Sequence, residues 1–288
     1  MARRATSPVV AIIVLTGLLL TAINVALFFS TSLIDANRQM MEYEAAKDQL
    51  TYAATALEQI AFGASGSRYV RFSLTSVEIN FLEGGYLDLR ICSLSDSERC
   101  FSPTGVPFPL RVVALKGGPF VTTVPRLLYP ETGELSVALN RLVVGPGEPL
   151  VVVYEDFNRR AYAYLVVRRV RVIYNGAFNI TETAAGIDCD GDRQLSNLPK
   201  CKFNFFTIQV VELEFGRLGG SGTVPVVFRN LGVDVYNYTF TGSNVRVEVK
   251  ILNEAREVLA RDWDQTKAPP ASGCVVVVKV ARINVSTG

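Results

Sequence analysis

The sequence contains no histidine among its 288 residues. Histidine is the commonest general base near neutral pH and the commonest metal ligand. Its absence excludes the serine–histidine and cysteine–histidine enzymes, together with metal sites built on imidazole. An enzyme could still use carboxylates, lysine or tyrosine, but no spacing of Asp and Glu favours a carboxylate-pair hydrolase. We therefore expect a protein without catalytic activity.

An excess of charge of one sign is also missing. Lys and Arg total 29 and Asp and Glu total 27, which gives a net charge of +2 at pH 7. Both signs are mixed along the chain. Proteins that bind nucleic acids carry clustered positive charge because they must neutralise phosphates. The sequence therefore predicts no nucleic-acid partner.

Cysteine is infrequent, and four of the five cysteines form two close pairs. Neither pair has the Cys-x-x-Cys spacing of a metal site, so local disulfides are the better interpretation and indicate a location outside the cytosol. The fifth cysteine, Cys274, is expected to be a buried free thiol in a strand. The expected disulfides join Cys92 to Cys100 and Cys189 to Cys201.

Three Asn-x-Ser/Thr sequons agree with an external location. They lie at Asn179, Asn237 and Asn284. Each is a candidate glycosylation site.

An apolar run with almost no interruption extends from Pro8 to Phe29. As a helix it would be about 33 Å long, enough to cross a bilayer core of roughly 30 Å. The run is too long for an ordinary removed signal peptide, and a cut after Ser30–Ser32 is the alternative. Arg3 and Arg4 would keep the start of the chain on the cytoplasmic side, which places the rest outside.

The helix is expected to continue beyond this run, because residues 8–62 contain no further proline and only one glycine. An apolar stripe with heptad spacing predicts an amphipathic second half, onto which a globular head would dock. Lys47 is its one polar member, and the GASGS segment at 63–67 ends the helix. The stripe consists of Leu33, Ala36, Met40, Tyr43, Leu50, Ala54, Leu57 and Ala61. Residues 6–62 would thus form one rod of about 80 Å.

The start of the chain, Arg-Arg-Ala-Thr-Ser-Pro-Val-Val followed by a long Leu/Ile/Val run, resembles the N-terminus of archaeal type IV pilins and pilin-like proteins. The resemblance implies a class III signal peptide, with a leader of residues 1–5 that a prepilin peptidase removes between Ala5 and Thr6. Val10 stands where bacterial-type pilins have a glutamate, as is common in the archaeal branch. The implied filament-core and membrane residues are Val9, Val10, Ile12, Leu15, Leu18, Leu19 and Leu20.

Residues 68–288 are expected to form an extracellular β-rich head. Many short segments of alternating polarity, separated by turn signals, predict an antiparallel β-sandwich. The fold class is therefore α+β, mainly β, with a long N-terminal helix. A division of the head into two β-units near 180–202 is an alternative to a single unit. We expect a hairpin at Gly84–Gly85, a hairpin turn at 216–223, and helical character only at 254–263. The expected strands are 109–115, 136–144, 150–155, 161–174, 203–215, 223–229, 233–240, 244–252 and 274–286.

The most polar loop, residues 186–201, contains three alternating aspartates, Asp188, Asp190 and Asp192. Their spacing is like the opening of a calcium loop, but Arg193 and Pro199 replace the glycine and the glutamate of an EF-hand. A solvated loop held by the Cys189–Cys201 disulfide and a calcium site are the two interpretations. Trp263, Tyr236 and Tyr238 are either a recognition patch or strand residues of the core.

Two functional hypotheses follow. In the first, the chain is a structural subunit, major or minor, of an archaeal type IV pilus-like filament on the cell surface. Its partners would be copies of itself or other pilins, the prepilin peptidase, the pilus assembly machinery and the membrane. In the second, the chain keeps its leader and is a bitopic, membrane-anchored extracellular binding module. A removed leader favours the first hypothesis.

Overall fold

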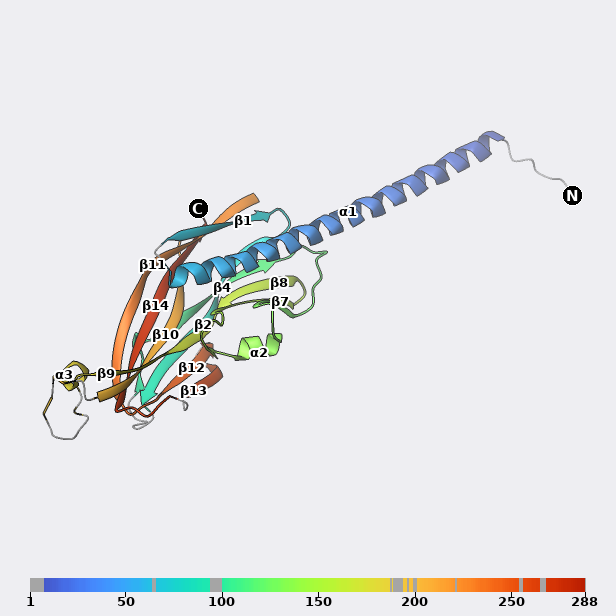
Figure 1. Cartoon of the computed structure of the whole chain (residues 1–288). Coiled ribbons are helices and arrows are strands. Elements are labelled where there is room, and N and C mark those ends of the chain that lie inside the picture. Colours follow the sequence, from blue (N-terminus) through green and yellow to red (C-terminus); the bar gives the residue numbers. More distant parts are fainter. Residues whose placement is uncertain are drawn as a thin grey trace.

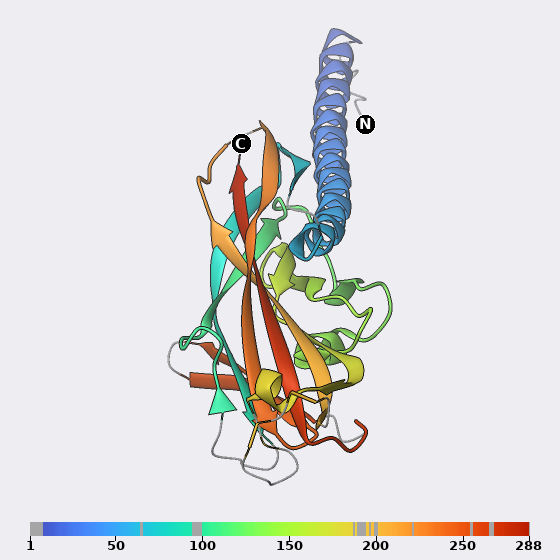
Figure 2. The same ribbon diagram turned by 60° about the vertical axis from the view of Figure 1, so that its left-hand side comes forward.

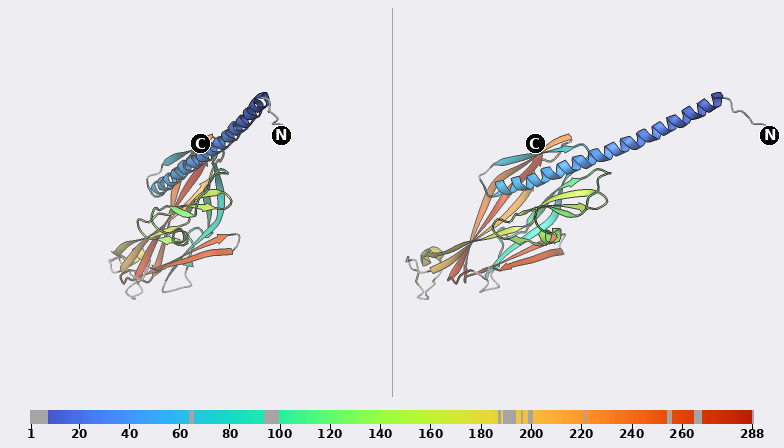
Figure 3. Two further views of the ribbon diagram at one scale, coloured as in Figure 1. Left: turned by 90° about the vertical axis from the view of Figure 1, so that its right-hand side faces the viewer. Right: turned by 45° about the vertical axis from the view of Figure 1, so that its right-hand side comes forward.

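The structure, a computed structural model, consists of one long helix and a β-rich head (Figure 1). It describes residues 8–63, 66–93, 100–186, 188, 194–195, 197–198, 201–220, 222–253, 256–264 and 268–287. Helix α1 (Pro8–Ala61) contains 54 residues and is continuous. Its first half projects away from the head, and its second half lies along the head (Figures 1 and 3). The predicted single rod is confirmed.

The head contains two mostly antiparallel sheets that face each other, as the turned view shows (Figure 2). The first sheet has the order β1 (Ser67–Leu74), β11 (Gly222–Thr241), β14 (Gly273–Thr287), β10 (Cys201–Phe215), β9 (Val170–Ile180) and β6 (Val143–Val144). Two of its pairs, β10 with β14 and β6 with β9, are parallel.

The second sheet has the order β13 (Arg256–Asp264), β12 (Val245–Asn253), β2 (Glu78–Ser93), β4 (Phe108–Lys116), β8 (Ala161–Val167), β7 (Val151–Phe157) and β5 (Arg126–Tyr129). The short strand β3 (Cys100–Phe101) pairs with β2. Two short helices, α2 (Leu135–Asn140) and α3 (Glu182–Ala185), lie in connections. Residues 180–202 lie between β9 and β10, which pair with each other, and both sheets take strands from either side of this segment.

Two apolar cores fill the head. The helix core combines α1 with both sheets and includes Leu50, Leu57, Leu115, Val153, Phe228 and Ile283. The distal core lies between the sheets away from α1 and includes Leu89, Ile91, Phe206, Ile208, Val247 and Val278. On β10, Val210 belongs to the distal core and Val211 to the helix core. Neighbouring residues of a strand point to opposite faces, so β10 buries one face in the distal core up to Val210 and the opposite face in the helix core from Val211 onward.

The Gly84–Gly85 hairpin is wrong. Both glycines lie inside the single strand β2, where the pairing with β4 shifts between Glu83 and Tyr86. Gly85 has φ 102°, a left-handed conformation that glycine adopts without strain. The extra residue is a β-bulge, and it exchanges the two faces of β2, so Ile79 and Phe81 pack on the helix core whereas Leu87 and Leu89 pack in the distal core.

Three other local expectations are also wrong. Residues 254–263 were expected to be helical, but Arg256–Asp264 pair with β12 as a strand. Most of the expected strand 136–144 is the helix α2. The segment 216–223 is not a hairpin turn, because β14 lies between β10 and β11. The loop instead passes over the end of β14, where Thr287 donates its backbone N–H to Arg217 O at 2.9 Å.

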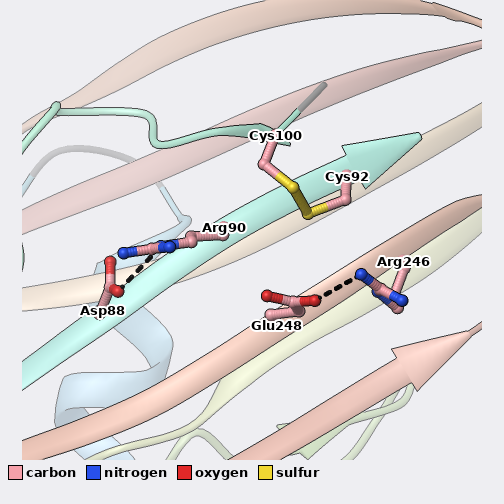
Figure 4. The surroundings of a disulfide bond; sticks show 6 residues. All are labelled: Asp88, Arg90, Cys92, Cys100, Arg246 and Glu248. Carbon is pink, nitrogen blue, oxygen red and sulfur yellow. Dashed lines mark hydrogen bonds and ion pairs between the residues drawn. A yellow bond between two sulfur atoms is a disulfide. The ribbon is translucent and has the colours of Figure 1, made fainter. Parts of the chain in front are cut away.

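The cysteine predictions are confirmed where the structure describes them. Cys92 and Cys100 form a disulfide that joins β2 to β3, beside the Arg90–Asp88 and Arg246–Glu248 ion pairs (Figure 4). Cys201 is disulfide-bonded, and its expected partner Cys189 lies outside the described residues. Cys274 is a buried free thiol in β14, and desolvation by burial raises its pKa to about 12.

Removing the Cys92–Cys100 disulfide should destabilise the head moderately. The two cysteines are 8 residues apart in sequence. A disulfide that closes so short a loop lowers the entropy of the unfolded chain and so stabilises the folded head by about 2 kcal/mol. We expect the double variant Cys92→Ala/Cys100→Ala to lose this amount of unfolding free energy in chemical denaturation without reductant. An unchanged midpoint and slope would show that the disulfide adds no stability.

Candidate functional site: the projecting half of the N-terminal helix

The projecting half of α1 is apolar on every side and has no partner in the described part of the chain. All its described side chains from Val10 to Thr31 are exposed. Leu18 is 66% exposed and Phe28 is 71% exposed. This helix is the one described helix that is long and apolar enough to cross a membrane. An all-apolar helix is stable only when lipid or other protein surrounds it.

The threonines in this half are compatible with an apolar environment. Thr16 donates its hydroxyl to Ile12 O at 2.8 Å, and Thr21 donates to Gly17 O at 2.8 Å. Thr31 makes the same bond to Leu27 O at 3.0 Å. Each hydroxyl is thus satisfied inside its own helix and need not be desolvated unpaired. The Asn24 amide has no hydrogen-bond partner among the residues that the structure describes, which distinguishes it from the threonines.

The second half of α1 packs into the head through the predicted stripe. Tyr43, Leu50, Ala54, Leu57 and Ala61 are buried in the helix core. The stripe docks only from Met40 onward, because Leu33 is 65% exposed. Burying each large apolar side chain contributes on the order of 2 kcal/mol. The docked half therefore holds the projecting half in a fixed direction relative to the head.

Hydrogen bonds attach the second half of α1 to the head at several points along its length. The Glu42 carboxylate accepts hydrogen bonds from the backbone N–H groups of Thr75 at 2.9 Å and Ser76 at 3.0 Å. Glu58 accepts from the backbone N–H of Leu150 and of Val151, the latter at 2.8 Å. These carboxylates hold loop and strand amides that would otherwise be unsatisfied next to the helix.

Further ties lie at the end of α1. The Glu58 carboxylate is paired with Arg171 at 3.0 Å. Asn230 of β11 donates its side-chain N–H to Ile60 O at 2.7 Å. The last carbonyls of a helix have no partner within the helix, so this amide caps the C-terminus of α1.

Lys47 is the polar member of the stripe, and it is buried in the interface. Its Nζ lies 2.6 Å from Glu155 Oε1 and 2.7 Å from Glu44 Oε1. The Lys47 side chain is 3% exposed and the Glu155 side chain is 0% exposed. Arg126 also contacts Glu155 Oε1, at 3.0 Å. Two cations on one carboxylate compensate for burying its charge.

The residues predicted from the sequence fall into three groups. Val10, Ile12, Leu15, Leu18, Leu19 and Leu20 all lie on the projecting half and are exposed. Ala5 and Thr6 lie outside the described residues, and Val9 lies in α1 without a described side chain. The sequons differ in accessibility, since Asn179 and Asn237 are exposed whereas Asn284 is half-buried.

The calcium loop falls largely outside the described residues, which include Asp188 but neither Asp190 nor Asp192. Within the part of the chain that the structure describes, no group of three or more His, Cys, Asp or Glu side chains could hold a metal ion. Tyr236 and Tyr238 are partly buried and pack against the distal core, while the side chain of Trp263 is outside the described part.

The sequence analysis missed the residues that anchor α1. Glu42, Glu58, Glu155 and Asn230 are far apart in sequence and meet only because the strands bring them to the helix. One signal was present, since a lysine on an otherwise apolar stripe needs a buried counter-charge. The sequence does not indicate which of the 27 acidic residues supplies it.

No family model, curated protein or solved structure matches this chain.

Proposed function

We propose that the chain is a structural subunit of a type IV pilus-like filament at the cell surface, assembled through the projecting half of α1. The observation that carries this proposal is the combination of two halves in one helix. The first is apolar on all sides and exposed, and the second is fixed to the head by a buried stripe and polar ties. A rigid rod of this kind can be stored in lipid and then packed against other copies.

Removal of the leader is physically required for this role. Arg3 and Arg4 precede the apolar run, and residues 1–5 would be the leader. A charge at the start of the helix would be drawn into an apolar bundle at a cost of several kcal/mol. A prepilin peptidase that cuts between Ala5 and Thr6 removes both arginines. The partners are then other copies or other pilins, together with the assembly machinery, and the exposed head makes surface contacts or adheres.

Asn24 is proposed to pair between neighbouring helices in the bundle. An amide in an apolar environment gains from a hydrogen bond to another helix, by about 1 kcal/mol in membranes. Asn24→Leu should therefore weaken self-association of the full chain in bilayers about fivefold, measured by energy transfer between labelled copies. Thr21→Val is the matched control, because Thr21 is satisfied by Gly17 O. Equal association of the Asn24→Leu variant and the wild type would exclude this pairing.

The second candidate is a bitopic anchor that presents an extracellular binding module. The same exposed apolar helix supports it, because a single span of this length also holds a protein in a bilayer. The two candidates differ in the leader and in the neighbours of the helix. An anchor keeps Arg3 and Arg4 and needs no other copies.

The deciding experiment is the mass and N-terminal sequence of the protein from a fraction sheared off the surface of its native cells. A chain that begins at Thr6 in sheared filaments supports the filament subunit. A chain that still carries Arg3 and Arg4, and stays with the membranes after shearing, overturns it and supports the anchor. Neither measurement depends on a ligand for the head.

A further inference from the structure

Two connections lie at the end of the head from which α1 projects. The first is the turn between β7 and β8, and the direction of β7 shows where it lies. Val151 at the start of β7 contacts Glu58, whereas Glu155 near its end contacts Lys47. The strand therefore runs toward the N-terminus of α1, and the β7–β8 turn lies beyond Lys47. We call Phe157 at the end of β7, the turn residues 158–160 and the β4–β5 loop residues 117–125 the proximal rim of the head.

The second loop is fixed to both the turn and the helix. Gly117 donates its backbone N–H to Ala161 O at 2.8 Å, which joins the loop to the start of β8. Phe120 donates its backbone N–H to Gln39 Oε1 at 3.3 Å. The rim therefore lies at the level of Gln39, on the side from which the projecting half extends (Figure 3).

The rim exposes apolar side chains. Phe120 is 50% exposed, Val124 is 69% exposed and Phe157 is 45% exposed. Phe120 and Val124 lie in the β4–β5 loop, which contacts α1 at Gln39, and Phe157 is the last residue of β7. Exposed aromatic and aliphatic side chains gathered at one end of a head indicate a contact surface.

Arginines accompany these apolar side chains. Arg38 of α1 and Arg159 of the turn are exposed, and Arg160 is half-exposed. Acidic side chains near the same end include Asp35, Asp156 and Glu78, and Glu78 is paired with Lys116 at the end of β4. Exposed apolar side chains beside arginines suit the membrane interface, because the apolar groups enter the headgroup and acyl boundary and the arginines attract anionic lipids.

The rim lies close enough along α1 to the apolar run to reach the headgroup layer when the helix spans a bilayer. Gln39 lies ten residues after Phe29, which corresponds to about 15 Å of helix. Ile34, which is 64% exposed, lies only about 7 Å from Gln39 along the axis. The headgroup layer is roughly 5–8 Å thick on each side of the hydrocarbon core. With Ile34 at the edge of the hydrocarbon, the rim reaches the headgroups.

We propose that the proximal rim rests on the outer surface of a bilayer containing anionic lipids while α1 spans it. Phe120, Val124 and Phe157 enter the headgroup layer, and Arg159 and Arg160 contact lipid phosphates. This inference rests on the membrane-inserted stage of the proposed function. The contact fixes the depth and direction of the subunit before assembly, and it is released when the helix is lifted into a filament.

The test places a fluorophore on the rim of the full chain in vesicles. A Cys274→Ser background leaves a single introduced cysteine free, at Val124, Val106 or Leu19. Val106 is the matched control, because it is 63% exposed and lies at the opposite end of β4. Vesicles of phosphatidylcholine, with and without phosphatidylglycerol, carry quenchers either near the headgroup or at the bilayer centre.

The expected result is strong headgroup-level quenching at Val124→Cys, little at Val106→Cys, and mid-bilayer quenching at Leu19→Cys. Arg159→Gln and Arg160→Gln should each lower the contacting population about fivefold in anionic vesicles, and hardly in neutral ones. Equal quenching at Val124→Cys and Val106→Cys, with Leu19→Cys quenched, overturns the rim contact alone. Absence of quenching at Leu19→Cys overturns the inserted stage as well. Crosslinks from Val124→Cys only to neighbouring subunits would make the rim a subunit interface and overturn the lipid contact.

Discussion

Replacement of Leu19 by aspartate is expected to abolish filament assembly and to release much of the protein from membranes. Leu19 lies in the middle of the projecting half and is 55% exposed. A carboxylate at the centre of a membrane-spanning helix costs about 3 kcal/mol for insertion. In a bundle of apolar helices the same charge would be buried without a partner, which costs more. The measurements are the yield of sheared filaments and the distribution of the protein between membrane and soluble fractions.

The matched control for Leu19→Asp is Val106→Asp. Val106 is also an exposed apolar residue, at 63% exposure, but it lies in the head. We expect this variant to assemble and to fractionate like the wild type. Filaments of normal yield and length from Leu19→Asp would mean that the projecting half is not a filament core. Normal membrane retention together with loss of filaments would separate assembly from anchoring.

Replacement of Lys47 by methionine is expected to destabilise the docking of α1 by about 3 kcal/mol, because it leaves the buried Glu155 carboxylate with fewer compensating charges. Methionine keeps most of the apolar stem of lysine, so the packing of the stripe is preserved. Arg126 still contacts Glu155, but its side chain is 56% exposed. The measurement is chemical denaturation of the full chain in detergent, followed by circular dichroism.

A double-mutant cycle tests whether the pair itself is responsible. Lys47→Met/Glu155→Leu removes both buried charges and should recover most of the lost stability, since apolar replacements of a buried pair are often neutral. Lys116→Met is the control, because the Lys116–Glu78 pair is 31% and 64% exposed and should contribute less than about 1 kcal/mol. If Lys47→Met is no more destabilising than Lys116→Met, the buried pair does not anchor the helix.

The parts of the fold that were predictable follow from local patterns. One helix was predicted from the apolar run, the apolar stripe that follows it, and the absence of proline after Pro8. The structure has this helix as α1, from Pro8 to Ala61. Period-two alternation predicted β4, β7, β10, β12 and β14 closely. In such segments, propensity, periodicity and burial all favour the same structure. The close cysteine pair likewise predicted the disulfide between Cys92 and Cys100.

The errors occurred where local pattern and tertiary pairing differ. EAREVLARDW has a helical pattern, but β12 offers an unpaired edge, and Arg256–Asp264 pair with it. Gly84 and Gly85 signal a turn in isolation, yet the partner strand β4 continues past them and makes them a bulge. A strand assignment depends on a partner that is distant in sequence, whereas a helix closes its own hydrogen bonds.

The sequence alone determined the rod, its apolar first half, the β-rich character of the head and the absence of histidine chemistry. These properties follow from composition and periodicity, which need no knowledge of distant contacts. Only the tertiary structure decided that β10 contributes to both cores, that Lys47 meets Glu155, and that the loop at 117–125 lies beside Gln39. Each depends on which strands become neighbours across the head, and that choice is made by the packing of the whole chain.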